Sequence, residues 1–176
     1  DIGCGYGIKL KEIIYNVCKD IVGIDNDESI GHCKSFHKFG KWYVDDIENS
    51  SLDLNRKFDM IIWSDVIEHL VDPDQLIKYI KKYCDIDTQI ILSTPDKGKI
   101  VGQSSEGPPI NIYHVREWNK LELYNYLKSN GFKIKKHFHV GERIKNSRKL
   151  IKIILGMDAF KTIQIVHCLK NGVSSN

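Results

Sequence analysis

The chain has 176 residues, 41% of them hydrophobic, and a formal net charge of +3. These values predict a single domain over residues 1–176 and give no reason to expect a nucleic-acid partner. Five cysteines without a Cys-x-x-Cys pair argue against a disulfide framework and a structural zinc site, and they indicate a reducing, cytoplasmic environment. No apolar run approaches the ~20 residues of a membrane span.

The chain opens on the glycine-rich segment Asp1-Ile2-Gly3-Cys4-Gly5-Tyr6-Gly7. Alternating glycines suit a strand-to-helix turn at which the backbone approaches a ligand closely. A dinucleotide fingerprint would place its third glycine where Ile8 stands, and Asp1 would repel a pyrophosphate. The segment therefore favours a ligand with a cationic amine. Because such a loop normally follows a complete strand, we expect most of a first, central strand to precede Asp1.

Hydrophobic patterns predict alternating strands and helices along the chain. Helices are expected at 8–17, 28–39, 72–83 and 117–130, and strands at 21–24, 41–44, 58–64, 89–94, 132–140 and 162–169. The alternation favours a parallel sheet, and the period-two patterns of the last two strands favour antiparallel pairing. We predict a Rossmann-like, doubly wound α/β fold. Its sheet would be seven-stranded and mostly parallel, with helices on both faces and an antiparallel final strand.

Two segments fall outside this alternation. Residues 96–111 are polar and contain three glycines and the pair Pro108-Pro109, so we predict a substrate lid over 96–116. Residues 141–161 are predicted to form a basic amphipathic insertion whose helix includes Lys145–Leu155. A solvated helix face is the favoured interpretation of its lysines. A weak membrane-surface contact and a groove for an anionic substrate are the alternatives.

Polar residues follow the predicted strands at their carboxyl ends, where ligands of parallel sheets bind. Asp25 can accept hydrogen bonds from a ribose diol, or it can serve as a helix cap. Asn26 is a candidate for the adenine edge. Asp45 and Asp46 follow the third strand, either as ligand groups or as solvated turn residues, and Ser64 ends the fourth. We expect these side chains to converge on one crevice with the glycine loop.

The run F-D-M-I-I-W-S-D-V-I-E-H-L-V-D-P at residues 58–73 is the most specific stretch after the glycine loop. Together with S-T-P at 93–95 and H-V-R-E-W at 114–118, it resembles class I S-adenosylmethionine (SAM)-dependent methyltransferases. The similarity is to the group that contains the ubiquinone-biosynthesis O-methyltransferases and many small-molecule and glycan methyltransferases. It covers residues 1 to about 140.

The resemblance implies that SAM is the cofactor and S-adenosylhomocysteine (SAH) the product. It assigns cofactor binding to Asp1, Gly3, Cys4, Gly5, Tyr6, Gly7, Asp25, Asn26, Asp46, Ile47 and Ser64. Asp46 and Ile47 match the family's "G-D-hydrophobic-E" segment, in which the acid accepts from the adenine amine. The acceptor is expected to be a small molecule, lipid precursor or sugar rather than DNA. The fourth strand ends in Ser64-Asp65, whereas DNA methyltransferases that act on amino groups have Asn/Asp-Pro-Pro-aromatic at this place.

Methyl transfer needs alignment and exclusion of water, and it needs a base only where the acceptor must lose a proton. His114 and His69 are the candidate bases, since histidine titrates near neutral pH. The alternative role for His69 is structural, packed under the fourth strand with Glu68 as its partner. Asp65, Glu68 and His69 could ligate Mg²⁺, but three polar residues in a loop are a common coincidence and we assign no metal.

Two rival functions follow from the same residues. A non-catalytic SAM-binding relative would keep the binding motifs without methyl transfer. An NAD-dependent oxidoreductase is disfavoured by Ile8 and Asp1.

Overall fold

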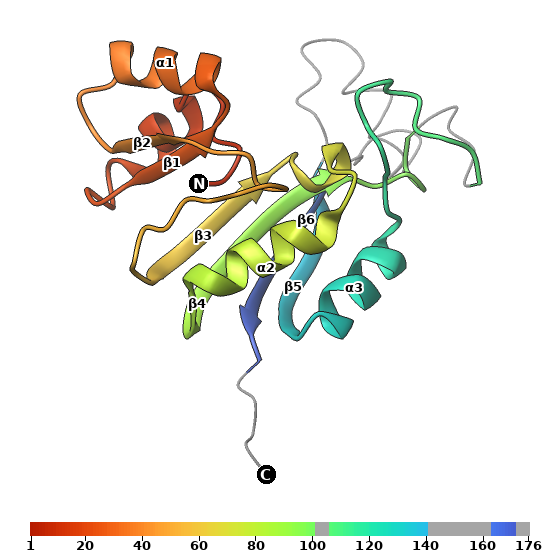
Figure 1. Cartoon of the computed structure of the whole chain (residues 1–176). Coiled ribbons are helices and arrows are strands. Elements are labelled where there is room, and N and C mark those ends of the chain that lie inside the picture. Colours follow the sequence, from red (N-terminus) through yellow and green to blue (C-terminus); the bar gives the residue numbers. More distant parts are fainter. Residues whose placement is uncertain (101–105, 141–162, 172–176) are drawn as a thin grey trace, which may run out of the picture.

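The structure is a computed structural model that describes residues 1–100, 106–140 and 163–171. Its strands are β1 (Val22–Asp25), β2 (Lys41–Val44), β3 (Phe58–Ser64), β4 (Cys84–Pro95), β5 (Phe132–Val140) and β6 (Ile163–Lys170). Its α-helices are α1 (Asp27–Phe36), α2 (Pro73–Tyr83) and α3 (Lys120–Ser129), joined by a π-helical turn η1 (Leu10–Ile14) and a 3-10 turn η2 (Ile67–His69). Figure 1 shows their arrangement. Each α-helix and strand lies where the hydrophobic pattern placed it, although several ends differ.

The strands form a two-stranded part, β1-β2, and a four-stranded part, β3-β4-β6-β5. β1 and β2 are parallel, as are β3 and β4, whereas β6 runs antiparallel to both β4 and β5. Ile2 joins the two parts through single parallel bridges to Ile24 and Trp63. Among the described residues Ile2 alone bridges to both β1 and β3. The described chain therefore forms six strands, not the seven that were expected.

Two hydrophobic cores lie on opposite faces of the β1–β2 part. Val22 and Ile24 point into the larger core, which also contains the apolar faces of α2 and α3. Trp42 points the other way, into a smaller core with Ile30 and Cys33 of α1. In the part of the chain that the structure describes, helices therefore cover both faces only at this end of the sheet.

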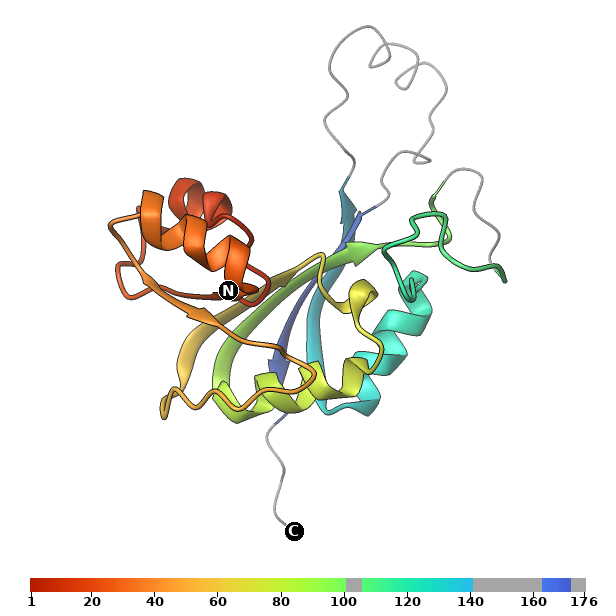
Figure 2. The same cartoon turned by 45° about the horizontal axis from the view of Figure 1, so that its top comes forward.

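The four-stranded part has one well-covered face. Figures 1 and 2 show α2 and α3 side by side against it, and the Tyr126 hydroxyl donates to Asp74 Oδ1 between them at 2.7 Å. The opposite face is less covered, since Met60 on β3 is 44% exposed. The expected helices on both faces are thus found only in part.

The helix expected at residues 8–17 differs most from its prediction. Its middle is the single π-helical turn η1, in which Leu10 alone is buried. Ile13 and Val17, which were expected to face the core, are 66% and 83% exposed. Leu10 and the partly buried Ile14 pack in the smaller core, whereas Ile8, Ile13 and Val17 face solvent. The predicted apolar stripe is therefore found only in part.

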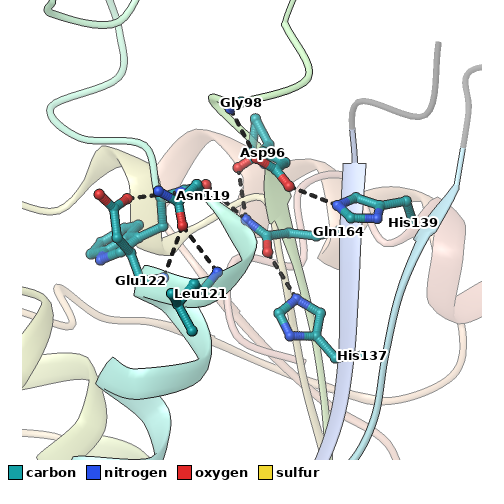
Figure 3. A network of polar contacts seen from close by, with 10 residues as sticks. Asp96, Gly98, Asn119, Leu121, Glu122, His137, His139 and Gln164 are labelled. Atoms are coloured by element: carbon teal, nitrogen blue, oxygen red, sulfur yellow. Dashed lines mark hydrogen bonds and ion pairs between the residues drawn. The ribbon is translucent and has the colours of Figure 1, made fainter. Parts of the chain in front are cut away.

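A buried glutamine ties β6 to the segment before α3 (Figure 3). Gln164 is fully buried, and its Nε2 donates to the carbonyl oxygens of Pro95 at 3.2 Å and Trp118 at 2.9 Å. Its Oε1 lies 2.8 Å from His137 Nε2 on β5. Because a carbonyl oxygen only accepts, His137 Nε2 carries the proton in this contact.

Asp96 fixes the start of the predicted lid beside this glutamine. Its carboxylate lies 2.6 Å from His139 Nε2 and accepts from the Gly98 amide at 2.9 Å. The Lys97 amide donates to the Trp118 carbonyl at 3.2 Å. The two ends of segment 96–116 are therefore held close together at the end of β4 (Figure 3).

Replacing Gln164 with leucine is expected to lower the free energy of unfolding by about 2–4 kcal/mol, because two buried carbonyl groups lose their donor. Gln89→Leu is the matched control, since Gln89 also makes two contacts but is only half-buried. It should change stability by about 0.5 kcal/mol or less. Urea unfolding of both variants measures the difference. Equal midpoints would contradict the structural role of Gln164.

Candidate functional site

A cavity of about 720 Å³ opens at the carboxyl ends of β1, β2 and β3. It is lined by Gly3, Gly5, Asp25, Asn26, Asp27, Ser29, Val44, Asp45, Asp46, Ile47, Asp65, Val66, His69 and Leu70. These residues come from four segments that are distant in sequence. Their convergence is what the strand-end argument predicted, and seven of the predicted site residues are among them: Gly3, Gly5, Asp25, Asn26, Asp46, Ile47 and His69.

The glycine loop forms one wall. Gly3, Gly5 and Gly7 have φ values of +69°, +53° and +72°, in the left-handed region that favours glycine. A Cβ on Gly3 would lie 2.4 Å from Cγ2 of Val66. The Gly5 amide donates to Asp25 Oδ2 at 2.7 Å, which fastens the loop to the end of β1. Both the loop's shape and its distance from the segment after β3 depend on glycine.

Cys4 is placed inside the protein rather than on the cavity wall. Its thiol is buried beside that of Cys33, and both contact the Gly5 carbonyl, at 3.6 Å and 3.3 Å. Burial raises the pKa of the Cys4 thiol to about 12. The side chain is therefore a neutral part of the smaller core, and any cofactor contact at this position would fall to the backbone.

Four other predicted cofactor residues are not among those that line the cavity: Asp1, Tyr6, Gly7 and Ser64. Tyr6 is 45% exposed and its hydroxyl donates to Glu28 Oε1 at 3.1 Å. Their cofactor roles stay predictions.

Five aspartates give the cavity its charge: Asp25, Asp27, Asp45, Asp46 and Asp65. Hydrogen bonds from the Asn49 side chain and the Glu48 amide hold the pKa of Asp46 below its usual range. In the described part of the chain, no lysine or arginine lines the cavity. The cavity therefore attracts cations and repels a pyrophosphate.

Three acids of this set, Asp27, Asp45 and Asp65, were not assigned to the cofactor from the sequence. Asp65 has a φ of +57°, which turns the chain directly after β3, and its Oδ1 accepts from Ser93 Oγ at 3.1 Å. Its position one residue after the predicted strand end was the available signal.

Asn26 combines two roles, since it lines the cavity while its Oδ1 accepts from the Ser29 amide as the cap of α1.

The two candidate bases lie against each other. His69 ends η2 and borders the cavity, and the edge of the His114 ring meets it with the ring centroids 4.8 Å apart. His69 Nδ1 lies 2.9 Å from the Tyr113 carbonyl oxygen, and His114 Nδ1 lies 2.5 Å from Glu117 Oε1. Because these oxygens accept, each Nδ1 carries a proton in a neutral ring and each Nε2 keeps its lone pair. His69 Nε2 is able to accept a proton from an acceptor molecule, whereas His114 Nε2 lies 2.9 Å from Asn111 Nδ2, a contact that an acceptor would have to replace.

Glu68 connects the end of the predicted lid to η2. Its backbone carbonyl accepts from the amides of Val115 at 2.8 Å and Arg116 at 3.2 Å. Its side chain is fully buried, and Oε2 accepts from Thr94 Oγ1 at 2.9 Å. Burial raises the pKa of this carboxyl. The interpretation of His69 as a residue paired with Glu68 is not what the structure shows, because His69 pairs with the Tyr113 carbonyl and Glu68 with Thr94.

The basic insertion 141–161, including Lys145–Leu155, lies outside the described residues, as do residues 101–105 of the predicted lid. Where the chain is described, none of its helices has the length and apolar character needed to cross a bilayer.

Known proteins match this chain in sequence. A probable SAM-dependent methyltransferase of Mycolicibacterium smegmatis is 26% identical over 136 residues, which are 76% of this chain and 51% of that protein. A probable SAM-dependent methyltransferase of Mycobacterium tuberculosis is 28% identical over 134 residues, 75% of this chain and 47% of that protein. The chain spans about half the length of these curated relatives.

Solved structures share the fold. A SAM-dependent methyltransferase from Clostridium acetobutylicum superimposes with a TM-score of 0.70 at 17% identity, covering 98% of this chain and 83% of that one. A plantazolicin methyltransferase in complex with SAH gives 0.69 at 18% identity, covering 98% and 76%. The profile of the family described as "Methyltransferase domain" matches residues 1–137. This chain therefore belongs to the methyltransferase-domain family, as the resemblance of its motifs to SAM-dependent methyltransferases predicted.

Proposed function

We propose that the protein transfers a methyl group from SAM to a small-molecule, lipid-precursor or sugar acceptor, at oxygen or nitrogen. The observation that carries this proposal is the anionic cavity beside the glycine loop, whose glycines have φ values in the left-handed region. SAM brings a sulfonium and an ammonium group, which carboxylates attract. NAD brings a pyrophosphate, which the same five aspartates repel.

We assign the predicted cofactor-binding roles to residues along the cavity wall. Asp25 would accept from the ribose diol beside Asn26, while Asp46 and Ile47 would meet the adenine. The glycine loop would hold the methionine end of SAM, and His69 borders the same cavity. Segment 96–116 would close over the acceptor, exclude water and complete the site. His114 or His69 would take the acceptor's proton where it has one to lose.

Calorimetry on the full-length protein tests the cofactor. SAM and SAH are expected to bind with micromolar dissociation constants, and NAD is not. Saturable NAD binding without SAM binding would refute the proposal. A screen of cell extract for transfer of a labelled methyl group then separates an enzyme from a non-catalytic SAM-binding relative, which would bind SAM and label nothing.

Asp25→Ala is expected to weaken SAM binding by about 1–3 kcal/mol, because buried polar partners of the carboxylate are left unpaired. Asp20→Ala is the control, since Asp20 pairs with Arg56 on the surface away from the cavity. Titration calorimetry on both variants gives the affinities, and thermal melts show whether each is folded. A folded Asp25→Ala protein with unchanged affinity would remove Asp25 from the ribose role.

A further inference from the structure

We propose that Lys9 binds the carboxylate of SAM while Asp65 binds its ammonium group, so that this pair selects a cofactor with an intact amino-acid end. The inference rests on the proposed function. The Lys9 ammonium lies 3.8 Å from Asp65 Oδ2. An α-amino acid carries an ammonium and a carboxylate side by side. The pair therefore presents the complementary charges next to each other at the edge of the cavity.

The rest of the cavity is unfavourable for a carboxylate. Five aspartates line it, and each of them repels a negative group. Lys9 is not a lining residue, but its ammonium reaches one of these acids. Among the ion pairs of the described residues, Lys9–Asp65 alone includes a carboxylate of the cavity wall. Lys9 is therefore the cation that the fold brings to this site.

The backbone of the glycine loop has few donors left for the carboxylate. Four amides of this loop donate within the protein at 2.7 Å to 3.1 Å, namely those of Gly3, Cys4, Gly5 and Gly7. Within residues 3–7, the Tyr6 amide is the one for which the described structure provides no acceptor. A carboxylate has two oxygens with about four lone-pair sites. One amide cannot satisfy them, so a side-chain donor is needed.

Lys9 and Asp65 can exchange partners at little cost. Their side chains are 59% and 48% exposed, so the ion pair adds little to the stability of the fold. Asp65 Oδ1 accepts from Ser93 Oγ at 3.1 Å, which orients the carboxylate and leaves Oδ2 toward Lys9. An arriving ammonium group would take Oδ2, and the Lys9 ammonium would turn to the carboxylate of the same cofactor. The charges stay paired before and after binding.

Calorimetry on the full-length protein with three probes tests this inference. SAH carries both charged groups, decarboxylated SAM keeps the ammonium without the carboxylate, and methylthioadenosine lacks both. Lys9→Met is expected to weaken SAH binding by about tenfold or more, because a charge-assisted hydrogen bond is lost. The same variant should bind methylthioadenosine as the wild type does, and decarboxylated SAM at least as tightly. Asp65→Asn should weaken both probes that carry the ammonium and leave methylthioadenosine unchanged.

Two further lysine variants are the controls. Lys11→Met removes an exposed lysine two residues further along η1 and should bind all three probes as the wild type does. Lys9→Arg keeps the charge and should bind SAH more tightly than Lys9→Met. Melting curves of all variants should match the wild type, since the exchanged side chains are exposed.

The outcomes separate this inference from the proposed function. Wild-type affinity of Lys9→Met for SAH would overturn the role of Lys9. An equal loss for SAH and methylthioadenosine would also overturn it, because the effect would then not depend on the carboxylate. A wild-type protein that binds no SAH would contradict the proposed function itself, and this inference with it.

Discussion

Replacing Gly3 with alanine is expected to abolish SAM binding and to lower the free energy of unfolding by about 2–4 kcal/mol. The new Cβ would lie 2.4 Å from Cγ2 of Val66, which is buried, and the φ of +69° is unfavourable for alanine. Val66 follows β3 and lines the same cavity. Relief of the clash therefore separates the glycine loop from the segment that faces it across the site.

The same substitution elsewhere gives the control. Gly31 lies within α1, and a Cβ there would meet nothing within 4 Å. Gly31→Ala is therefore expected to stabilise the protein by about 0.5–1 kcal/mol. Thermal unfolding and SAM calorimetry compare the two variants. A Gly3→Ala protein that melts and binds SAM like the wild type would show that the loop tolerates a side chain.

His114→Ala is expected to reduce methyl transfer by about 10²–10⁴-fold while SAM affinity stays within a few-fold. The His114 side chain is 10% exposed and lies against His69, whereas the cavity wall itself is built without it. Removing it therefore takes a group from the acceptor side and leaves the cofactor side unchanged. The rate is measured by transfer of labelled methyl to the acceptor that the extract screen identifies.

A His167→Ala variant, which loses an imidazole remote from the cavity, should retain wild-type turnover. If His114→Ala also turns over normally, His114 has a structural role and His69 is the remaining base.

The fold could be predicted where the periodicity of apolar residues and the order of elements along the chain are sufficient evidence. Strands such as β3, with its run of apolar residues, and the capped start of α2 at Asp72-Pro73 are local features. The convergence of Asp25 and Asp46 followed from a general rule for parallel sheets. The order of the strands in the sheet could not be predicted in this way, because no local sequence signal shows that β6 lies between β4 and β5.

The site was less predictable for the same reason. Cys4 sits in a ligand-binding motif, but the alternation of its neighbours turns the thiol into the core beside Cys33. His69 and His114 were each proposed alone, and only tertiary packing brings their rings to 4.8 Å. The unpaired Oε1 of Glu68 likewise depends on tertiary packing, because the side chain is buried and only its Oε2 accepts from Thr94.

The position of β6 between β4 and β5 determines when this half of the sheet can form during synthesis. A ribosome makes β4 and β5 first, yet neither has its shared neighbour until Ile163–Lys170 has been translated and has left the exit tunnel. Until then the edges of β4 and β5 that later pair with β6 stay open, and open strand edges can recruit other chains. Completion of this half of the sheet therefore waits for β6.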